Sequence, residues 1–96
     1  MLVLVTYDVS TVEAAGRRRL RRVAQACKDY GLRVQKSVFE CQVGQKEWAQ
    51  LRARLLQEMD VEQDSLRFYF LDETAAQRIE HHGNAKPADL NEPLLL

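Results

Sequence analysis

Asp8 is the residue of this sequence best placed to do chemistry. It ends the apolar run LVLVTYD at residues 2–8, and Ser10 and Glu13 follow with the spacing of a helix-capping box. A carboxylate at a strand end suits a hard cation such as Mg²⁺, which takes oxygen ligands and keeps several waters. An aspartate in this position is also a common turn or capping residue, so both roles are open on the residues alone.

The charges of the chain are segregated although the formal net charge is zero. Asp29 is the only acid between residues 17 and 36, whereas acids dominate from Glu58 onward. Arg18 and Arg22 are expected nearly opposite the apolar stripe of a helix and so available to solvent. This asymmetry favours a polyanion such as nucleic acid facing one surface. A solvated arginine-rich helix balanced by neighbouring acids is the alternative.

Several other function classes find no support in the residues. There is no glycine-rich phosphate loop and no zinc-ligand spacing, and His81 and His82 are adjacent on an expected strand, which points them to opposite faces. Cys27 and Cys41 are interpreted as small buried thiols. No apolar run is long enough for a membrane span and the N-terminus lacks a signal peptide, so we expect a cytoplasmic protein without a membrane partner.

Hydrophobic periodicity predicts the elements that must position these groups. After the strand at 2–8 the pattern predicts a helix from Ser10 to about Tyr30, with Gly31 as its stop. The remaining predictions are one strand or two short strands over 32–43 with a bulge near Lys36 and Ser37, a helix over 45–59, a strand over 65–71 and a weaker strand over 77–82. The chain divides into a domain over 1–83 and a tail over 84–96 without periodicity.

This order predicts an α+β, ferredoxin-like βαββαβ fold with an additional C-terminal strand. Both helices would cover one face of an antiparallel sheet, and the other face would be open. The residues expected on the open face are apolar, which favours a sheet-to-sheet homodimer about a two-fold axis. Such a dimer would pair two copies of Asp8. The expected interface residues are Val3, Val5, Tyr7, Tyr69 and Leu71.

Four segments together resemble the CRISPR-associated protein 2 family. They are VTYDVS at the end of the first strand, the arginine-rich helix after it, YGLRVQKSVFEC at 30–41 and SLRFYFLDETAAQRIEHHG at 65–83. The resemblance runs in order over residues 1–83. It is carried by the Tyr-Asp strand end in combination with the segment at 30–41.

The resemblance implies a ferredoxin-like homodimer in which Asp8 binds Mg²⁺ at the dimer axis and serves catalysis. It implies a metal-dependent endonuclease on single-stranded RNA or double-stranded DNA that acts in spacer acquisition and antiviral defence. It also implies a partner, the integrase of the CRISPR-associated protein 1 family. Residues at positions resembling those that line the family's cleft or contact nucleic acid are Arg17, Arg19, Arg33 and Ser37.

Two hypotheses follow, and a third is disfavoured. The chain is a magnesium-dependent nuclease whose metal is held by Asp8 from both subunits, or it is a non-catalytic dimeric adaptor that holds DNA and bridges integrase subunits. A small-molecule regulatory domain of the same fold would not need the cluster of arginines between residues 17 and 22.

Overall fold

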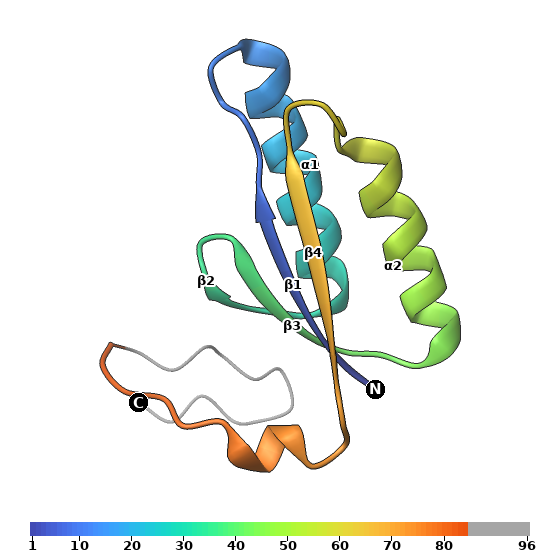
Figure 1. The fold of residues 1–96 in the computed structure, drawn as a ribbon, viewed down its shortest axis with the longest axis vertical. Helices are drawn as coiled ribbons and strands as arrows, with labels where there is room; N and C mark the ends of the chain where they lie inside the picture. The colour runs from blue at the N-terminus through green and yellow to red at the C-terminus, as the bar shows by residue number, and fades with distance from the viewer. Residues whose placement is uncertain (85–96) are drawn as a thin grey trace.

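The computed structural model describes residues 1–84, and the rest of the expected C-terminal tail lies outside the described residues. It has the predicted ferredoxin-like α+β architecture (Figure 1). The elements are β1 (Leu2–Asp8), α1 (Ala14–Tyr30), β2 (Leu32–Gln35), β3 (Val38–Gln42), α2 (Gln45–Glu58), β4 (Ser65–Leu71) and a 3₁₀ helix, η1 (Ala75–Arg78).

The four strands form one antiparallel sheet in the order β2-β3-β1-β4. The strand β1 is central and pairs along its length with β4, from Leu2 opposite Leu71 to Asp8 opposite Ser65. Both helices cover one face of this sheet (Figure 1). The C-terminal end of β1, the start of α1 and the loop before β4 therefore meet at one end of the molecule, whereas η1 lies at the other.

The structure reverses the expected faces of β1. Val5 and Tyr7 were predicted to face a partner subunit, but they are 0% and 6% exposed and pack under the helices with Val3. That prediction was wrong because both faces of β1 are apolar, so alternation alone does not say which face the helices take. Tyr69 and Leu71 do lie on the open face. They stand opposite Leu4 and Leu2, whose side chains alternate with those of Val3 and Val5 and so point away from the helices.

The helix α1 begins four residues later than predicted. Ser10 was expected as its N-cap, but residues 10–13 form a loop that folds back over the first turn of the helix. Gly16 permits this close approach, because a Cβ there would stand 1.8 Å from the carbonyl oxygen of Ser10. The predicted end is confirmed: the backbone N–H of Gly31 donates to the carbonyl of Cys27 at 2.8 Å.

The weaker strand predicted over residues 77–82 was wrong. The 3₁₀ helix η1 takes its place, and no strand follows β4 within residues 1–84. Asp72 nucleates the turn, because its carboxylate accepts hydrogen bonds from the backbone N–H and the hydroxyl of Thr74 at 3.1 and 2.8 Å. Side chains of this kind compete with strand pairing for the backbone groups.

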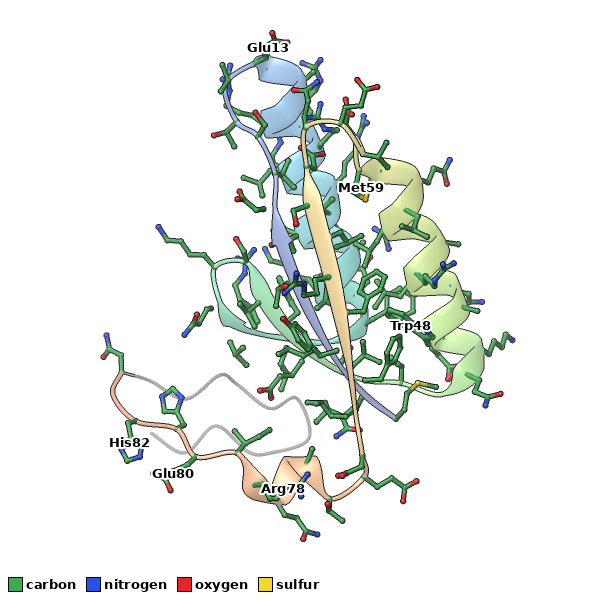
Figure 2. All side chains as sticks on the ribbon, viewed as in Figure 1. Glu13, Trp48, Met59, Arg78, Glu80 and His82 are labelled. Carbon is green, nitrogen blue, oxygen red and sulfur yellow. The ribbon has the colours of Figure 1, made fainter. Side chains whose placement is uncertain are left out.

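Two further expectations are confirmed, for residues 32–43 and for the cysteines. Residues 32–43 form two short strands, with a register shift between Arg33 and Gln35 beside the hairpin turn. Cys27 and Cys41 are buried free thiols. Trp48 projects from α2 toward β4 (Figure 2) and packs edge-on against Phe68, at 4.7 Å between ring centroids.

Nowhere in residues 1–84 is a helix both long enough and apolar enough to cross a membrane.

Candidate nucleic-acid interface

Asp8 lies exposed on the open face of the sheet, at the C-terminal end of β1. It is in phase with Leu4 and Thr6 and sits across the ladder from Ser65. Within residues 1–84 no hydrogen bond or ion pair engages its carboxylate, and no three potential metal ligands cluster anywhere. Asp8 therefore does not belong to a ready-made ligand cluster within the described residues, and a metal held there needs further oxygen ligands.

Asp64 organises the end of the molecule where Asp8 lies. Its Oδ1 accepts hydrogen bonds from the backbone N–H of Ser10 and from Nη2 of Arg19, both at 3.1 Å. Its Oδ2 accepts from Nε of Arg19 at 2.8 Å and from the backbone N–H of Asp60 at 2.9 Å. The carboxylate thus ties together the loop after Asp8, the helix α1 and the loop before β4.

The Asp64 side chain is fully buried, and its hydrogen bond from Arg19 is the main reason that its pKa is lowered from the ordinary value. Asp64 was not predicted as a site residue, because it lies in an acidic connection and is separated from Arg19 by 45 positions. Nothing in the local spacing pairs the two. Arg19 was expected at a position that lines the family's cleft or contacts nucleic acid; in the structure its side chain is 16% exposed and is engaged by Asp64.

The other predicted arginines differ in their availability. Nη1 of Arg17 donates to the carbonyl of Thr11 at 3.1 Å, and Nη1 of Arg22 lies 3.8 Å from Glu58. Arg18 is exposed and has no ion pair within the described part of the chain. Arg17, Arg18 and Arg22 thus form an exposed basic surface on α1, whereas Arg33 and Ser37 belong to a separate hollow.

This hollow, the basic groove, has a volume of about 580 Å³ and lies between α1 and the β2–β3 hairpin. Tyr7 forms part of its wall and fixes the hairpin: its hydroxyl donates to the carbonyl of Lys36 at 3.2 Å, and its backbone N–H donates to that of Ser37 at 3.1 Å. Burial raises the pKa of Tyr7, and a hydrogen bond from Arg33 offsets part of that effect. The lining residues are Tyr7, Leu20, Arg21, Ala24, Gln25, Lys28, Arg33, Lys36 and Ser37.

Arg33 and Ser37 were predicted as site residues, whereas Arg21, Lys28 and Lys36 were not. A signal for two of them was present, because Arg17, Arg21 and Lys28 have spacings of four and seven residues and so share a helix face. Tyr7 was assigned to the wrong face. Since side chains alternate along a strand, the groove at Tyr7 and the carboxylate of Asp8 lie on opposite sides of the end of β1.

The histidines take no part in this end of the molecule. His82 lies beyond η1 with Glu80, and both are labelled in Figure 2 at the end opposite to Glu13, which precedes α1. His82 contacts Glu80, and both side chains are highly exposed.

The comparisons with known proteins agree on one family. The family model described as CRISPR associated protein Cas2 matches residues 1–79. A relative in Chlorobaculum tepidum, named CRISPR-associated endoribonuclease Cas2, is 58% identical over 96 residues and covers 100% of both chains. A relative of the same name in Nitratidesulfovibrio vulgaris is 58% identical over 97 residues, which are 100% of this chain and 94% of the relative.

A solved structure gives the same result for the fold. The crystal structure of Streptococcus pyogenes Cas2 at pH 6.5 superposes with a TM-score of 0.77 at 53% identity. The match covers 86% of this chain and 100% of that one. Sequence and fold thus point to one family.

Proposed function

This chain belongs to the CRISPR-associated protein Cas2 family, and from that premise we propose that it is a metal-dependent endoribonuclease of CRISPR spacer acquisition and antiviral defence. Relatives that match along its full length carry the name endoribonuclease. The observation that carries the proposal is the free, exposed carboxylate of Asp8 at the end of the central strand. Exposed basic side chains on α1 and on the β2–β3 hairpin are suited to hold a phosphodiester chain.

We propose Mg²⁺ as the cofactor, held by Asp8 from both subunits of a dimer. The donor set fits a hard cation, because Asp8 offers carboxylate oxygens and magnesium binds through one or two carboxylates while it keeps several waters. When bound, the ion polarises a phosphate and supplies an activated water. The residues of the chain then hold the cation in place, and the basic side chains orient the phosphodiester.

The open face of the sheet supports a homodimer. Tyr69 and Leu71 are 42% and 37% exposed there, next to the half-buried Leu4. An exposed apolar sheet face of this kind is typical of an interface, and a two-fold contact would cover it with the same face of a second copy. Since Asp8 is on that face, the same axis brings its two copies toward one another.

Charge placed on the open face is expected to separate the dimer. The double variant Tyr69→Glu and Leu71→Glu should sediment as a monomer, because each interface would bury four unpaired carboxylates. RNA cleavage should fall with it, since the two Asp8 copies are separated. The matched control is Leu56→Glu, on the solvent side of α2 at 41% exposure, which should leave the mass unchanged. A double variant that remains dimeric at the wild-type concentration would contradict this interface.

Metal removal tests the proposed activity directly. Purified protein with end-labelled single-stranded RNA should cut in Mg²⁺, stop in excess EDTA and recover when Mg²⁺ is restored in excess. The reason is that the metal supplies the activated water in the proposed site, and residues 1–84 hold no cluster of three or more His, Cys, Asp or Glu side chains. Duplex DNA is the parallel substrate. Absence of cleavage of both substrates across a pH and metal series would refute the nuclease function.

A second candidate function is a non-catalytic adaptor. The observation that favours it is the exposed basic surface on α1, set against the lack of any cluster of three or more potential metal ligands within residues 1–84. We propose that in this role the dimer holds a DNA duplex and bridges integrase subunits of the CRISPR-associated protein 1 family in the cytoplasm. The two functions are compatible, and DNA binding measured in EDTA distinguishes the adaptor role from cleavage.

A further inference from the structure

Two side chains of opposite charge lie on the open face of the sheet, one on each side of β1. Glu40 of β3 stands opposite Leu4 in the ladder, and Arg67 of β4 stands opposite Thr6. Residues directly opposite in antiparallel strands point to the same face of the sheet. Both charges therefore share the face of Leu4 and Thr6, on which Asp8 also lies.

Glu40 is a half-buried carboxylate without a partner in the described chain. Its ladder neighbours on the same face are Leu4 on one side and Leu32 on the other. No hydrogen bond or ion pair engages its carboxylate within residues 1–84. Covering this face with a second protein surface desolvates the charge, which is costly unless a cation arrives with that surface.

Arg67 is a cation on the same face and has no carboxylate partner within residues 1–84. Its Nη1 donates to the hydroxyl of Tyr69 at 3.0 Å, and its guanidinium lies 5.9 Å from the centroid of the Tyr69 ring. Tyr69 stands opposite Leu4, as Glu40 does from the other side. The two contacts thus draw the guanidinium along β4 toward the level of Glu40.

The two charges do not meet within one chain. The strand β1 lies between β3 and β4, and the side chains of a sheet stand roughly perpendicular to it, so Glu40 and Arg67 extend side by side. A second copy that covers the open face brings opposite charges together. A two-fold axis along β1 lays β3 of one copy over β4 of the other, and Glu40 then faces the second copy's Tyr69 with its bound guanidinium across the ~10 Å that separate packed sheets.

Like charges disfavour the neighbouring axes. An axis along β3 would set the two Glu40 carboxylates against one another, and an axis along β4 would do the same with the two Arg67 guanidinium groups. Of the three axes, the one along β1 joins opposite charges. It also keeps both Asp8 carboxylates near the axis, because Asp8 is the last residue of β1.

We propose that Glu40 pairs with Arg67 of a second copy across a two-fold axis along β1, and that Tyr69 holds the arginine in position for this contact. Two-fold symmetry makes the pair twice in each dimer, once in each direction. The pair deepens the proposed function, since it rests on the homodimer and names the charges that set its axis.

Charge reversal tests the pair in the purified protein. Glu40→Arg alone and Arg67→Glu alone each oppose like charges in two places, so the dissociation constant of the dimer should rise by about a hundredfold or more. The two reversals in one chain oppose unlike charges again and should restore the dimer. Sedimentation velocity over a concentration series measures the constant.

Mixing the two single variants gives an independent readout. One variant carries only cations at the two positions and the other carries only carboxylates, so each repels its own kind and attracts the other. Equal amounts should form a heterodimer although neither variant forms a homodimer. A mass tag on one variant identifies the mixed dimer by native mass spectrometry.

The controls reverse the same charges elsewhere. Glu62→Arg in the loop before β4 and Arg52→Glu on α2 lie at exposed positions away from the open face, and they should leave the dissociation constant near wild type. Circular dichroism checks that each variant is folded.

Neutral variants keep the test valid if a reversed charge unfolds the chain. Glu40→Gln and Arg67→Gln should each weaken the dimer about tenfold, because each leaves the partner charge desolvated and unpaired. The two neutral substitutions together should weaken it no further than the worse single one, since no unpaired charge remains.

The possible outcomes decide the proposal. A wild-type dissociation constant in the reversed or neutral variants, or two single variants that stay monomeric when mixed, overturns the pair and leaves the homodimer in place. Loss of RNA cleavage by Arg67→Gln with an undiminished dimer assigns Arg67 to the substrate and also overturns the pair. A wild type that dimerises through the pair but never cuts RNA refutes the nuclease function and leaves the pair in place.

Discussion

Asp8→Asn is expected to lower the rate of RNA cleavage in Mg²⁺ by about a thousandfold, which corresponds to ~4 kcal/mol of transition-state stabilisation. The asparagine keeps the size of the side chain but removes the negative charge and replaces one oxygen ligand with an amide that cannot bind a cation. The Asp8 side chain is exposed and makes no hydrogen bond or ion pair within residues 1–84, so stability should not change. Single-turnover cleavage of labelled RNA measures the effect.

The matched control is Glu62→Gln, an exposed acid in the loop that leads to β4, which should cut at the wild-type rate. Undiminished metal-dependent cleavage by Asp8→Asn would refute the assignment of Asp8 as a metal ligand. Sedimentation of the variant as a dimer is required for the comparison, because loss of assembly would also lower activity. DNA binding should persist in the variant, as the adaptor function demands.

Mixed dimers of wild type and Asp8→Asn test whether the two Asp8 copies hold one shared metal ion. If both Asp8 copies hold one metal, dimers formed from equal amounts of wild type and Asp8→Asn retain about one quarter of the wild-type activity, since only the wild-type pairs are complete. Two independent sites would instead retain about half. The measurement uses subunits mixed after denaturation and refolded together, with wild type refolded alone as the reference.

Asp64→Asn is expected to lower the free energy of unfolding by about 2–4 kcal/mol. The buried carboxylate accepts four hydrogen bonds, from Ser10, Asp60 and Arg19. An asparagine side chain has one oxygen only, and its amide hydrogens would meet donors, which leaves buried groups unpaired. Urea unfolding followed by circular dichroism measures the loss, with Glu62→Gln as the control. A change below ~1 kcal/mol would contradict the role of Asp64 in holding the loops together.

The Asp64 carboxylate makes the free energy of unfolding depend on pH. The pKa of Asp64 is lower in the folded protein than in the unfolded chain, where it is about 3.9. The contribution of Asp64 to the free energy of unfolding is therefore complete above the pKa of the unfolded state. It is lost as the pH falls through the lower pKa of the folded state. The difference in unfolding free energy between wild type and Asp64→Asn should narrow below about pH 4. A difference that stays constant from pH 7 to pH 3 would contradict this linkage.

Most of the fold could be predicted because the signals are local. The limits of β1 and β4, the end of α1 at Gly31 and nearly the whole of α2 follow from hydrophobic periodicity and helix-stop residues. Asp8 was found in the same way, as a polar residue that ends an apolar run. The start of α1 escaped prediction because Ser10 has the chemistry of a cap, while in the folded protein its N–H is taken by Asp64.

The strands β1 to β4, the two helices, the position of Asp8 and the family could be predicted from the amino-acid sequence, since each depends on residues close in the chain. The face of β1 that the helices cover is known only from the folded chain, because Val5 and Leu4 are both apolar and alternation is symmetric. The folded chain also pairs Arg19 with Asp64 and gathers Arg21 and Lys36 around one hollow. Such contacts arise from the register and packing of distant segments, and a local pattern carries no information about them.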